Sequence, residues 1–205
     1  MFVAVGEIGP EAGLAARFCQ WARRLGHEAR LLIPALPDDA RDVVAELGGD
    51  GVDVFVISGS ARPHLIGARL LHLEARHLLD SSLAGIARGA FEEARRNGAL
   101  ISIDLGDFEW IGERGGSRTA YALAAIHPDI LFADTLSAAQ LGAPLEGIAS
   151  VPVVKRPDGC SVFGRYVAAP AMAPAAPGAV EAAFCVAFLE GHAPVEAAGR
   201  AVLIR

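Results

Sequence analysis

Short apolar runs alternate with amphipathic helical patterns along most of this chain, and this alternation restricts the fold more than any other feature. The runs are four to five residues long, and stretches with apolar residues three or four positions apart separate them. Strands joined through helices run parallel, with the helices covering the sheet faces. We therefore expect an α/β fold with a mostly parallel sheet, built from Phe2–Val5, Arg30–Ile33, Asp53–Ile57, Arg69–Leu73, Leu100–Asp104 and Ile130–Ala133.

The intervening segments predict the covering helices. The most regular is Leu83–Arg96, with an apolar stripe on one side and Glu and Arg residues opposite. Ala179–Glu190 is apolar nearly all round, which indicates a buried central helix. The other predicted helices are Leu14–Leu25, Pro37 to Leu47, Thr119–Ile126 and a final one from about Pro194.

The pattern changes after residue 150. Val151–Lys155 and Cys160–Val167 flank the turn sequence Arg156-Pro157-Asp158-Gly159, which predicts a hairpin of antiparallel strands at the sheet edge. A loop rich in Pro and Ala, Met172–Pro177, leads into the buried helix. We expect a single domain over residues 1–205.

Composition excludes several functional classes. The chain is 53% hydrophobic and 20% charged, as packed globular proteins are, yet no apolar stretch reaches the length of a membrane span. A net charge of −6 argues against nucleic-acid or membrane binding. The cysteines Cys19, Cys160 and Cys185 have no CxxC spacing and indicate buried thiols in a cytoplasmic protein.

Local motifs give little chemistry by themselves. Gly6, Gly9 and Gly13 follow the first strand, but their spacing differs from the dinucleotide pattern GxGxxG and favours a plain tight turn. The histidines form no ligand pattern, so we expect no metal site in the protein. GxSxG and GxxxxGK[ST] are absent, which argues against serine hydrolases and P-loop enzymes.

One segment, Pro177–Phe184, suggests an anion site. A glycine-containing loop opens a helix, so unpaired amides there face a possible anion, with Glu181 in the first turn. The alternative is that Gly178 only permits a turn and Glu181 only complements the helix dipole. Local features favour this alternative.

Seven segments in chain order carry a family resemblance: LAARFCQWARRLGHEARLL (Leu14–Leu32), PDDARDVVAELGGDGVDV (Pro37–Val54), ARLLHLEARHLL (Ala68–Leu79), GALISIDLGDFEW (Gly98–Trp110), HPDILFADTLSAAQL (His127–Leu141), VVKRPDGCSVF (Val153–Phe163) and PGAVEAAFCVAFLEGHAPVEAAGRA (Pro177–Ala201). Together they resemble the ribokinase-like (PfkB) carbohydrate kinases. The resemblance implies a three-layer α/β/α core, ATP and Mg as cofactors, and transfer of a phosphoryl group to a sugar hydroxyl.

The resemblance also implies roles for individual residues. The nucleotide would lie against Lys155, Asp158, Gly159, Gly178 and Ala179, and the substrate near Gly13 and Asp104. The catalytic base of the family's GAGD signature falls on Glu181 in one alignment and on Ala182 in another.

This chain departs from the family in ways that place catalysis in doubt. The segments between Glu7 and Gly13 and between Ile57 and Gly67 are too short for the strands of the family's lid. The Asn-x-x-Glu pair that organises magnesium falls on Asp134 and Ser137. We expect a shortened homologue with weak or lost sugar kinase activity, using ATP and Mg only if active. The alternatives are a genuine kinase with Glu181 as base, and a non-catalytic protein that forms a homodimer through the surface left by the lid.

Overall fold

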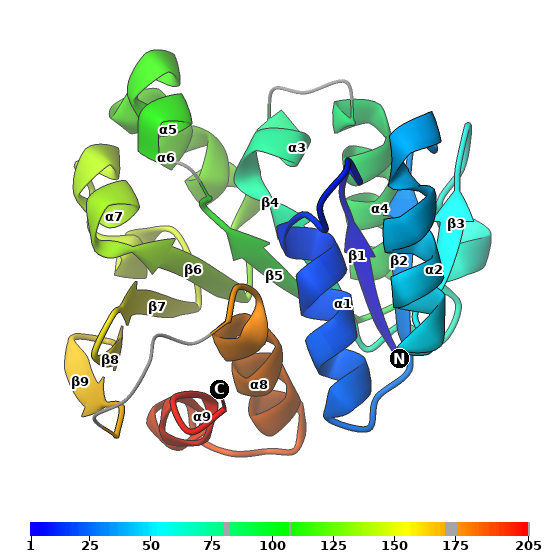
Figure 1. Ribbon diagram of the computed structural model, residues 1–205. Coiled ribbons are helices and arrows are strands. Elements are labelled where there is room, and N and C mark those ends of the chain that lie inside the picture. The colour runs from blue at the N-terminus through cyan, green and yellow to red at the C-terminus, as the bar shows by residue number, and fades with distance from the viewer. Residues whose placement is uncertain (80–82, 107, 171–175, 205) are drawn as a thin grey trace.

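Nine strands form one sheet in the computed structural model, which describes residues 1–79, 83–106, 108–170 and 176–204 (Figure 1). The strand order is β3-β2-β1-β4-β5-β6-β7-β8-β9, and every pair from β3 to β7 is parallel. The strands are β1 Phe2–Val5, β2 Ala29–Ile33, β3 Asp53–Val56, β4 Leu70–Glu74, β5 Leu100–Asp104, β6 Ile130–Asp134, β7 Val151–Arg156, β8 Gly159–Val162 and β9 Arg165–Ala168. All six strands expected from the apolar runs are confirmed.

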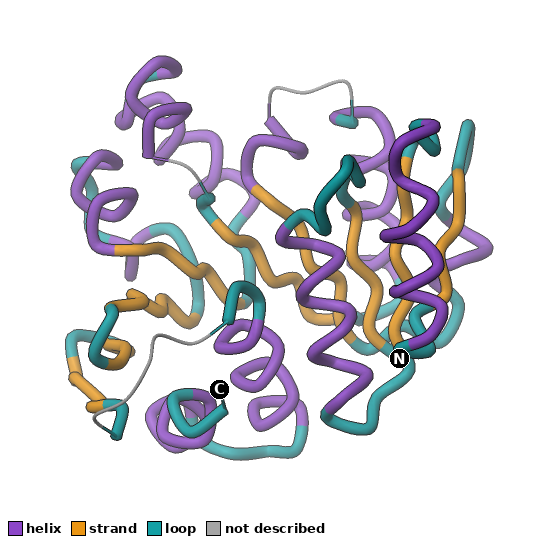
Figure 2. The backbone as a smooth tube through the Cα atoms, viewed as in Figure 1, coloured by secondary structure: helices purple, strands orange, loops and turns teal. Residues whose placement is uncertain are grey.

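Helices cover both faces of the sheet, as Figure 2 shows in purple beside the orange strands. The helices are α1 Leu14–Arg24, α2 Arg41–Gly49, α3 Ala75–Leu79, α4 Ala84–Arg96, α5 Phe108–Arg114, α6 Gly116–Ile126, α7 Thr135–Leu141, α8 Ala179–Leu189 and α9 Pro194–Ala201. One apolar core joins the sheet to α1, α2, α8 and α9, and a second joins it to α3, α4, α5, α6 and α7. The expected three-layer α/β/α architecture is therefore confirmed.

The edge hairpin is confirmed, but its second strand is shorter than predicted. Instead of one strand over Cys160–Val167, β8 ends at Val162 and β9 begins at Arg165, and the two strands pair antiparallel. Phe163 and Gly164 between them both have positive φ, 50° and 72°, which makes a tight hairpin turn. A phenylalanine is uncommon at such a position, so no turn was predicted there.

Three short helices, α3, α5 and α7, were not predicted. They contain five to seven residues each, and a helix of at most two turns is too short to show a helical period. The predicted Pro/Ala loop over Met172–Pro177 lies mostly outside the described residues, which resume at Ala176.

Helix α8 is buried between α1 and α9, as its all-round apolar sequence predicts. The ring of Phe184 meets that of Phe132 in β6 edge to face, with centroids 5.5 Å apart. At the start of α8, Gly178 has φ +78°, and a Cβ there would lie 2.7 Å from the backbone N of Phe18. Glycine is therefore required at this position, since the start of α8 rests directly on the backbone of α1.

The carboxyl ends of the parallel strands meet at one edge of the sheet, where open α/β sheets hold their ligands. Three of these strands end in carboxylates, at Glu74, Asp104 and Asp134. Within the described ranges, no strand lies outside the one sheet, and the segment after β1 makes only an isolated bridge between Ile8 and Ala12. This agrees with the expected absence of the lid strands. No helix in the described part of the chain could span a membrane.

Candidate functional site

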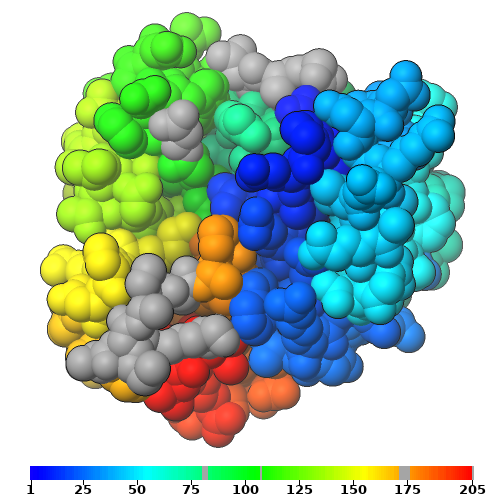
Figure 3. Space-filling model, in the orientation of Figure 1, coloured from blue at the N-terminus to red at the C-terminus, as the bar shows by residue number. Residues whose placement is uncertain are grey.

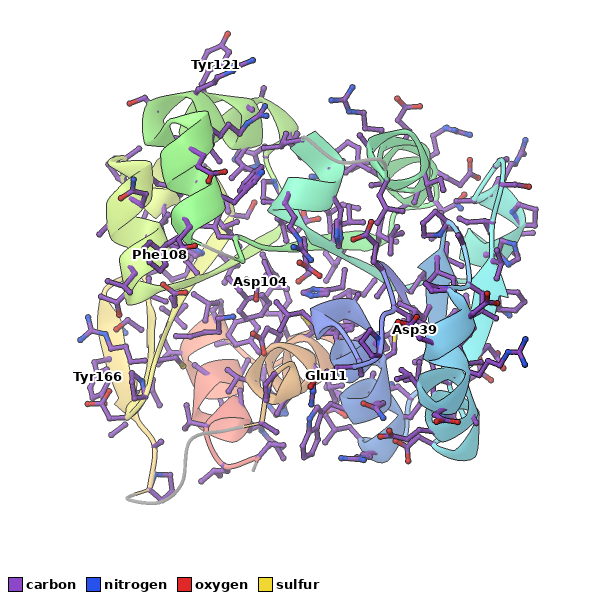
Figure 4. The ribbon with its side chains drawn as sticks, turned by 45° about the horizontal axis from the view of Figure 1, so that its top comes forward. Glu11, Asp39, Asp104, Phe108, Tyr121 and Tyr166 are labelled. Carbon is purple, nitrogen blue, oxygen red and sulfur yellow. The ribbon has the colours of Figure 1, made fainter. Side chains whose placement is uncertain are left out.

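Lys155 forms ion pairs with two buried carboxylates at the carboxyl edge of the sheet. Its Nζ lies 2.6 Å from Oδ2 of Asp104 at the end of β5, and it also contacts Oε1 of Glu181 in the first turn of α8. The side chains of Asp104 and Glu181 are only 4% and 6% exposed, and that of Lys155 is 23% exposed. We call these three residues the Lys155 triad. Figure 4 labels Asp104, which lies in the middle of the molecule between its helices.

The charges of the triad are set by burial and by the partners. Burial alone would lower the pKa of Lys155, but the two carboxylates outweigh it and raise the pKa well above its usual range. Burial would raise the pKa of Asp104, yet the ammonium of Lys155 and the N–H of Gly106 lower it. Asp104 therefore stays ionised beside a permanently charged Lys155.

Glu181 behaves differently from Asp104. Burial raises its pKa, the negative charge of Asp104 raises it further, and Lys155 offsets these effects only in part. As pH falls, Glu181 is thus the member of the triad that takes up a proton first. A carboxyl group with a raised pKa next to a cavity is a common property of catalytic acids and bases.

A cavity of about 260 Å³ opens beside the triad. Lys155 and Arg156 line it from β7, Gly178 and Glu181 from the start of α8, and Leu14 from the start of α1. Figure 3 shows the orange start of α8 between the blue α1 and the yellow hairpin. Three elements that are distant in sequence therefore meet at this site.

The amides at the start of α8 are partly occupied by the protein itself. The N–H of Ala179 donates to the carbonyl of Ala176 at 3.0 Å, and the carboxylate of Glu181 accepts a hydrogen bond from its own N–H. Since an anion at a helix start needs such donors, the protein's own groups compete with any external anion here.

The structure distinguishes between the two residues matched to the catalytic base. Glu181 lines the cavity, whereas Ala182 is completely buried in the apolar core. Of the other residues expected at the site, Lys155 and Gly178 line the cavity, and Asp104 reaches it through its ion pair with Lys155. The catalytic role of Glu181 itself stays a prediction.

The remaining expected site residues have structural contacts of their own. Gly13 precedes α1, and a Cβ there would come within 3.0 Å of the carbonyl oxygen of Glu7. The carbonyl of Asp158 accepts hydrogen bonds from the hydroxyl of Tyr166 and the N–H of Ala169. Gly159 has φ +155°, and a Cβ there would lie 2.2 Å from the carbonyl oxygen of Val167 in the paired strand β9. Their ligand contacts stay predictions.

A polar layer beneath the triad was not predicted. Nδ1 of His72 and Oγ of Ser102 are hydrogen-bonded at 3.0 Å, and the ring of His72 stacks on Phe18 at 4.0 Å between centroids. Burial lowers the pKa of His72 to about 4, so it is neutral at physiological pH. The alternation of side chains along β4 and β5 could have predicted this layer. His72 and Ser102 each lie two residues before a strand-end carboxylate and therefore on the same face of the sheet as that carboxylate.

The residues matched to the magnesium-organising pair serve as a helix cap. Oδ1 of Asp134 accepts the N–H of Ser137 at 2.7 Å, and the hydroxyl of Ser137 donates to the carbonyl of Gly106 at 2.8 Å. Across residues 1–79, 83–106, 108–170 and 176–204, no group of three or more His, Cys, Asp or Glu side chains could hold a metal ion. Asp134 and Ser137 are therefore engaged with each other and with Gly106 at the start of α7.

No protein-family model matches the sequence, and no curated protein matches it. Solved structures do match its fold. An adenosine kinase from Sinorhizobium meliloti has a TM-score of 0.80 and 14% identity, over 94% of this chain and 75% of that one. A probable sugar kinase from Rhizobium etli has a TM-score of 0.78 and 16% identity, over 94% and 74%.

A putative ribokinase II from E. coli, in complex with ATP and Mg, has a TM-score of 0.75 and 16% identity, over 96% of this chain and 88% of that one. The resemblance to ribokinase-like (PfkB) kinases thus holds at the level of the fold. At 205 residues this chain is shorter than these neighbours.

Proposed function

We propose that this protein is a shortened homologue of ribokinase-like sugar and nucleoside kinases in which phosphoryl transfer to a sugar is weak or lost. The observation that supports this is the Lys155 triad. The only lysine of the chain is bound by both carboxylates that the family resemblance places at the reaction centre, Asp104 and Glu181.

A general base must accept the proton of the attacking hydroxyl, so its carboxylate has to be within reach of the substrate. In this protein Lys155 and the residue's own N–H engage the carboxylate of Glu181. Displacing one partner of a buried ion pair costs roughly 3–5 kcal/mol. A substrate would have to supply that free energy before the chemistry began.

Two observations on the described residues argue against tight binding of the cofactors that the fold implies. The cavity of about 260 Å³ is smaller than the roughly 300–1,000 Å³ typical of small-molecule sites. Asp134 is committed to capping α7, and the described residues contain no metal-binding cluster. We therefore derive no reaction step through ATP or magnesium.

The test is an ADP-release assay with MgATP over a panel of sugars and nucleosides, with an active ribokinase measured in parallel. We expect no sugar-dependent ADP formation above the rate without protein. Removal of a single positioned catalytic group lowers rates by about two to four orders of magnitude. The assay must therefore detect rates that far below the rate of the active ribokinase. Saturable turnover on any acceptor would overturn the proposal.

A second candidate is a functioning kinase with Glu181 as the base. Its raised pKa and its place at the cavity favour this alternative. If wild type turns over, Glu181→Gln should abolish ADP formation, since an amide cannot accept the proton. Glu190→Gln, at the other end of α8, is the matched control and should keep full activity.

A third candidate is self-association through the surface left by the missing lid. Phe108 and Leu136 follow β5 and β6 at the carboxyl edge and are 40% and 61% exposed. Exposed large apolar side chains at one edge suit contact with a second copy. Light scattering after size exclusion tests this, with Phe108→Glu expected to convert a dimer to a monomer; a wild-type monomer at all concentrations argues against it.

A further inference from the structure

A second cavity, of about 390 Å³, lies on the opposite face of β7 from the Lys155 triad. Side chains alternate along β7, so Val153 and Lys155 face α8, whereas Pro152, Val154 and Arg156 lie on the α7 side. We call this cavity the α7 groove. Its volume falls within the rough 300–1,000 Å³ range of small-molecule sites.

Small apolar side chains form two walls of the α7 groove. Ala138 and Ala139 form the wall from α7, and Pro152 and Val154 form the wall from β7. Because alanine side chains are small, the helix leaves a slot between itself and the sheet. Such a slot suits a flat apolar group.

Arg156 provides a positive charge at this groove. Its guanidinium lies 5.7 Å from the ring centroid of Tyr166 in β9, which holds it by a cation–π contact. No carboxylate of the residues that the structure describes forms an ion pair with Arg156. Ser161, 8% exposed, adds a hydroxyl to the floor between the two strands. Glu146 also lines the groove but forms no ion pair with Arg156. The groove therefore combines apolar walls with one cation and, apart from it, one carboxylate.

Phe163 stands at the end of the groove in an unusual conformation. It has φ +50° and is 47% exposed, although glycine or asparagine would form this turn with less strain. The turn therefore holds an aromatic ring next to the groove, although its backbone is strained and about half of the apolar side chain is exposed to water. A ligand that stacks on Phe163 would cover that apolar surface.

We infer that the α7 groove binds a small aromatic carboxylate. The ring lies between Ala139 and Val154 with its edge against Phe163, and the carboxylate pairs with Arg156. The apolar walls of this site, Ala139, Val154 and Phe163, do not line the triad cavity, whereas Arg156 lines both cavities. Binding between these walls does not depend on whether the protein transfers phosphoryl groups.

The test is titration calorimetry with 2-naphthoate, and with 2-naphthalenemethanol as the uncharged ligand of the same shape. We expect one saturable site for 2-naphthoate. The alcohol should bind at least about tenfold more weakly, since a charge-assisted hydrogen bond is stronger than a neutral one.

Two variants locate the site. Arg156→Met should weaken 2-naphthoate by about tenfold or more, whereas Arg165→Met, an exposed arginine on the same hairpin opposite Val162, should leave it unchanged. Because Arg156 also borders the triad cavity, Ala139→Trp fills the groove alone and should abolish binding. Thermal unfolding of each variant verifies that it is folded.

The inference would be overturned by no binding of 2-naphthoate to wild type, by equal affinity for the acid and the alcohol, or by unchanged affinity in Ala139→Trp. A dimer that Ala139→Trp dissociates would also overturn it, because the occupant would then be a second copy of the chain. The calorimetric titration contains no ATP and the kinase assay contains no 2-naphthoate, so the two tests fail independently.

Discussion

Lys155 Nζ and Asp104 Oδ2 lie 2.6 Å apart although their strands are not neighbours. Strand β6 lies between β5 and β7, so the lysine side chain crosses over the end of β6 to reach its partner. The same ammonium contacts Glu181 at the start of α8. One side chain therefore links the parallel sheet, the edge hairpin and the central helix.

Lys155→Met should destabilise the protein substantially. Removing the ammonium leaves two buried carboxyl groups without their partner, and breaking a buried pair in this way costs about 3–5 kcal/mol. Urea unfolding measures the change. Arg24→Met, which removes an ion pair with Asp50 whose arginine is 51% exposed, is the control and should cost less than about 1 kcal/mol. Equal losses in the two variants would contradict a structural role of the triad.

Gly178→Ala should be among the most damaging single-methyl changes in the chain. The added Cβ would lie 2.7 Å from the backbone of α1, and the backbone of an alanine is strained at φ +78°. We expect the unfolding free energy to fall by more than about 1 kcal/mol.

Gly89→Ala is the matched control for Gly178→Ala. Gly89 lies inside α4 with no atom within 4 Å of a Cβ, so alanine should stabilise the protein by about 0.5–1 kcal/mol. A neutral effect at Gly178 would mean that α8 does not rest on α1 as described.

The raised pKa of Glu181 predicts a dependence of stability on pH. Between its usual pKa and its raised one, the folded protein binds more protons than the unfolded chain, so falling pH stabilises the fold through this group. Glu181→Gln removes that contribution. Wild type should therefore gain stability relative to Glu181→Gln as pH falls from 8 towards 4.5. Parallel stability curves for the two proteins over this range would rule out a raised pKa.

His72 predicts the opposite trend at lower pH. Burial lowers its pKa from 6.5 to about 4, so the unfolded chain binds the proton first and stability falls as pH drops from 6.5 to 4. His72→Gln should reduce this loss. Chemical-shift titration of the His72 ring checks the pKa directly, and protonation near pH 6.5 would contradict the buried geometry.

The sequence contained enough information for most of the scaffold. Apolar runs such as Leu100–Asp104 gave strands directly, because parallel strands buried on both faces are continuously apolar. The all-round apolar pattern after Ala179 gave the buried helix. Helices such as α7, with seven residues, carry too few turns to show a period.

The candidate site was only partly predictable. Asp104, Lys155 and Glu181 were each expected at a ligand site through the family resemblance. The ion pairs between these three residues depend on the order of the strands in the sheet and on the position of α8 against it. No local sequence pattern predicts either. The α7 groove was not predicted, because its walls come from the unpredicted α7 and its end from the unexpected turn at Phe163.

The ion pairs of Lys155 also constrain how this chain can change over evolution. A variant that freed Glu181 for proton transfer would lose the contacts that stabilise the edge hairpin and α8, and natural proteins have only a small margin of stability to lose. Under the proposed function, a gain of catalysis would therefore require compensating mutations elsewhere in the core before the lysine is replaced. Because their loss lowers stability, the ion pairs of the triad make the present arrangement easier to keep than to reverse.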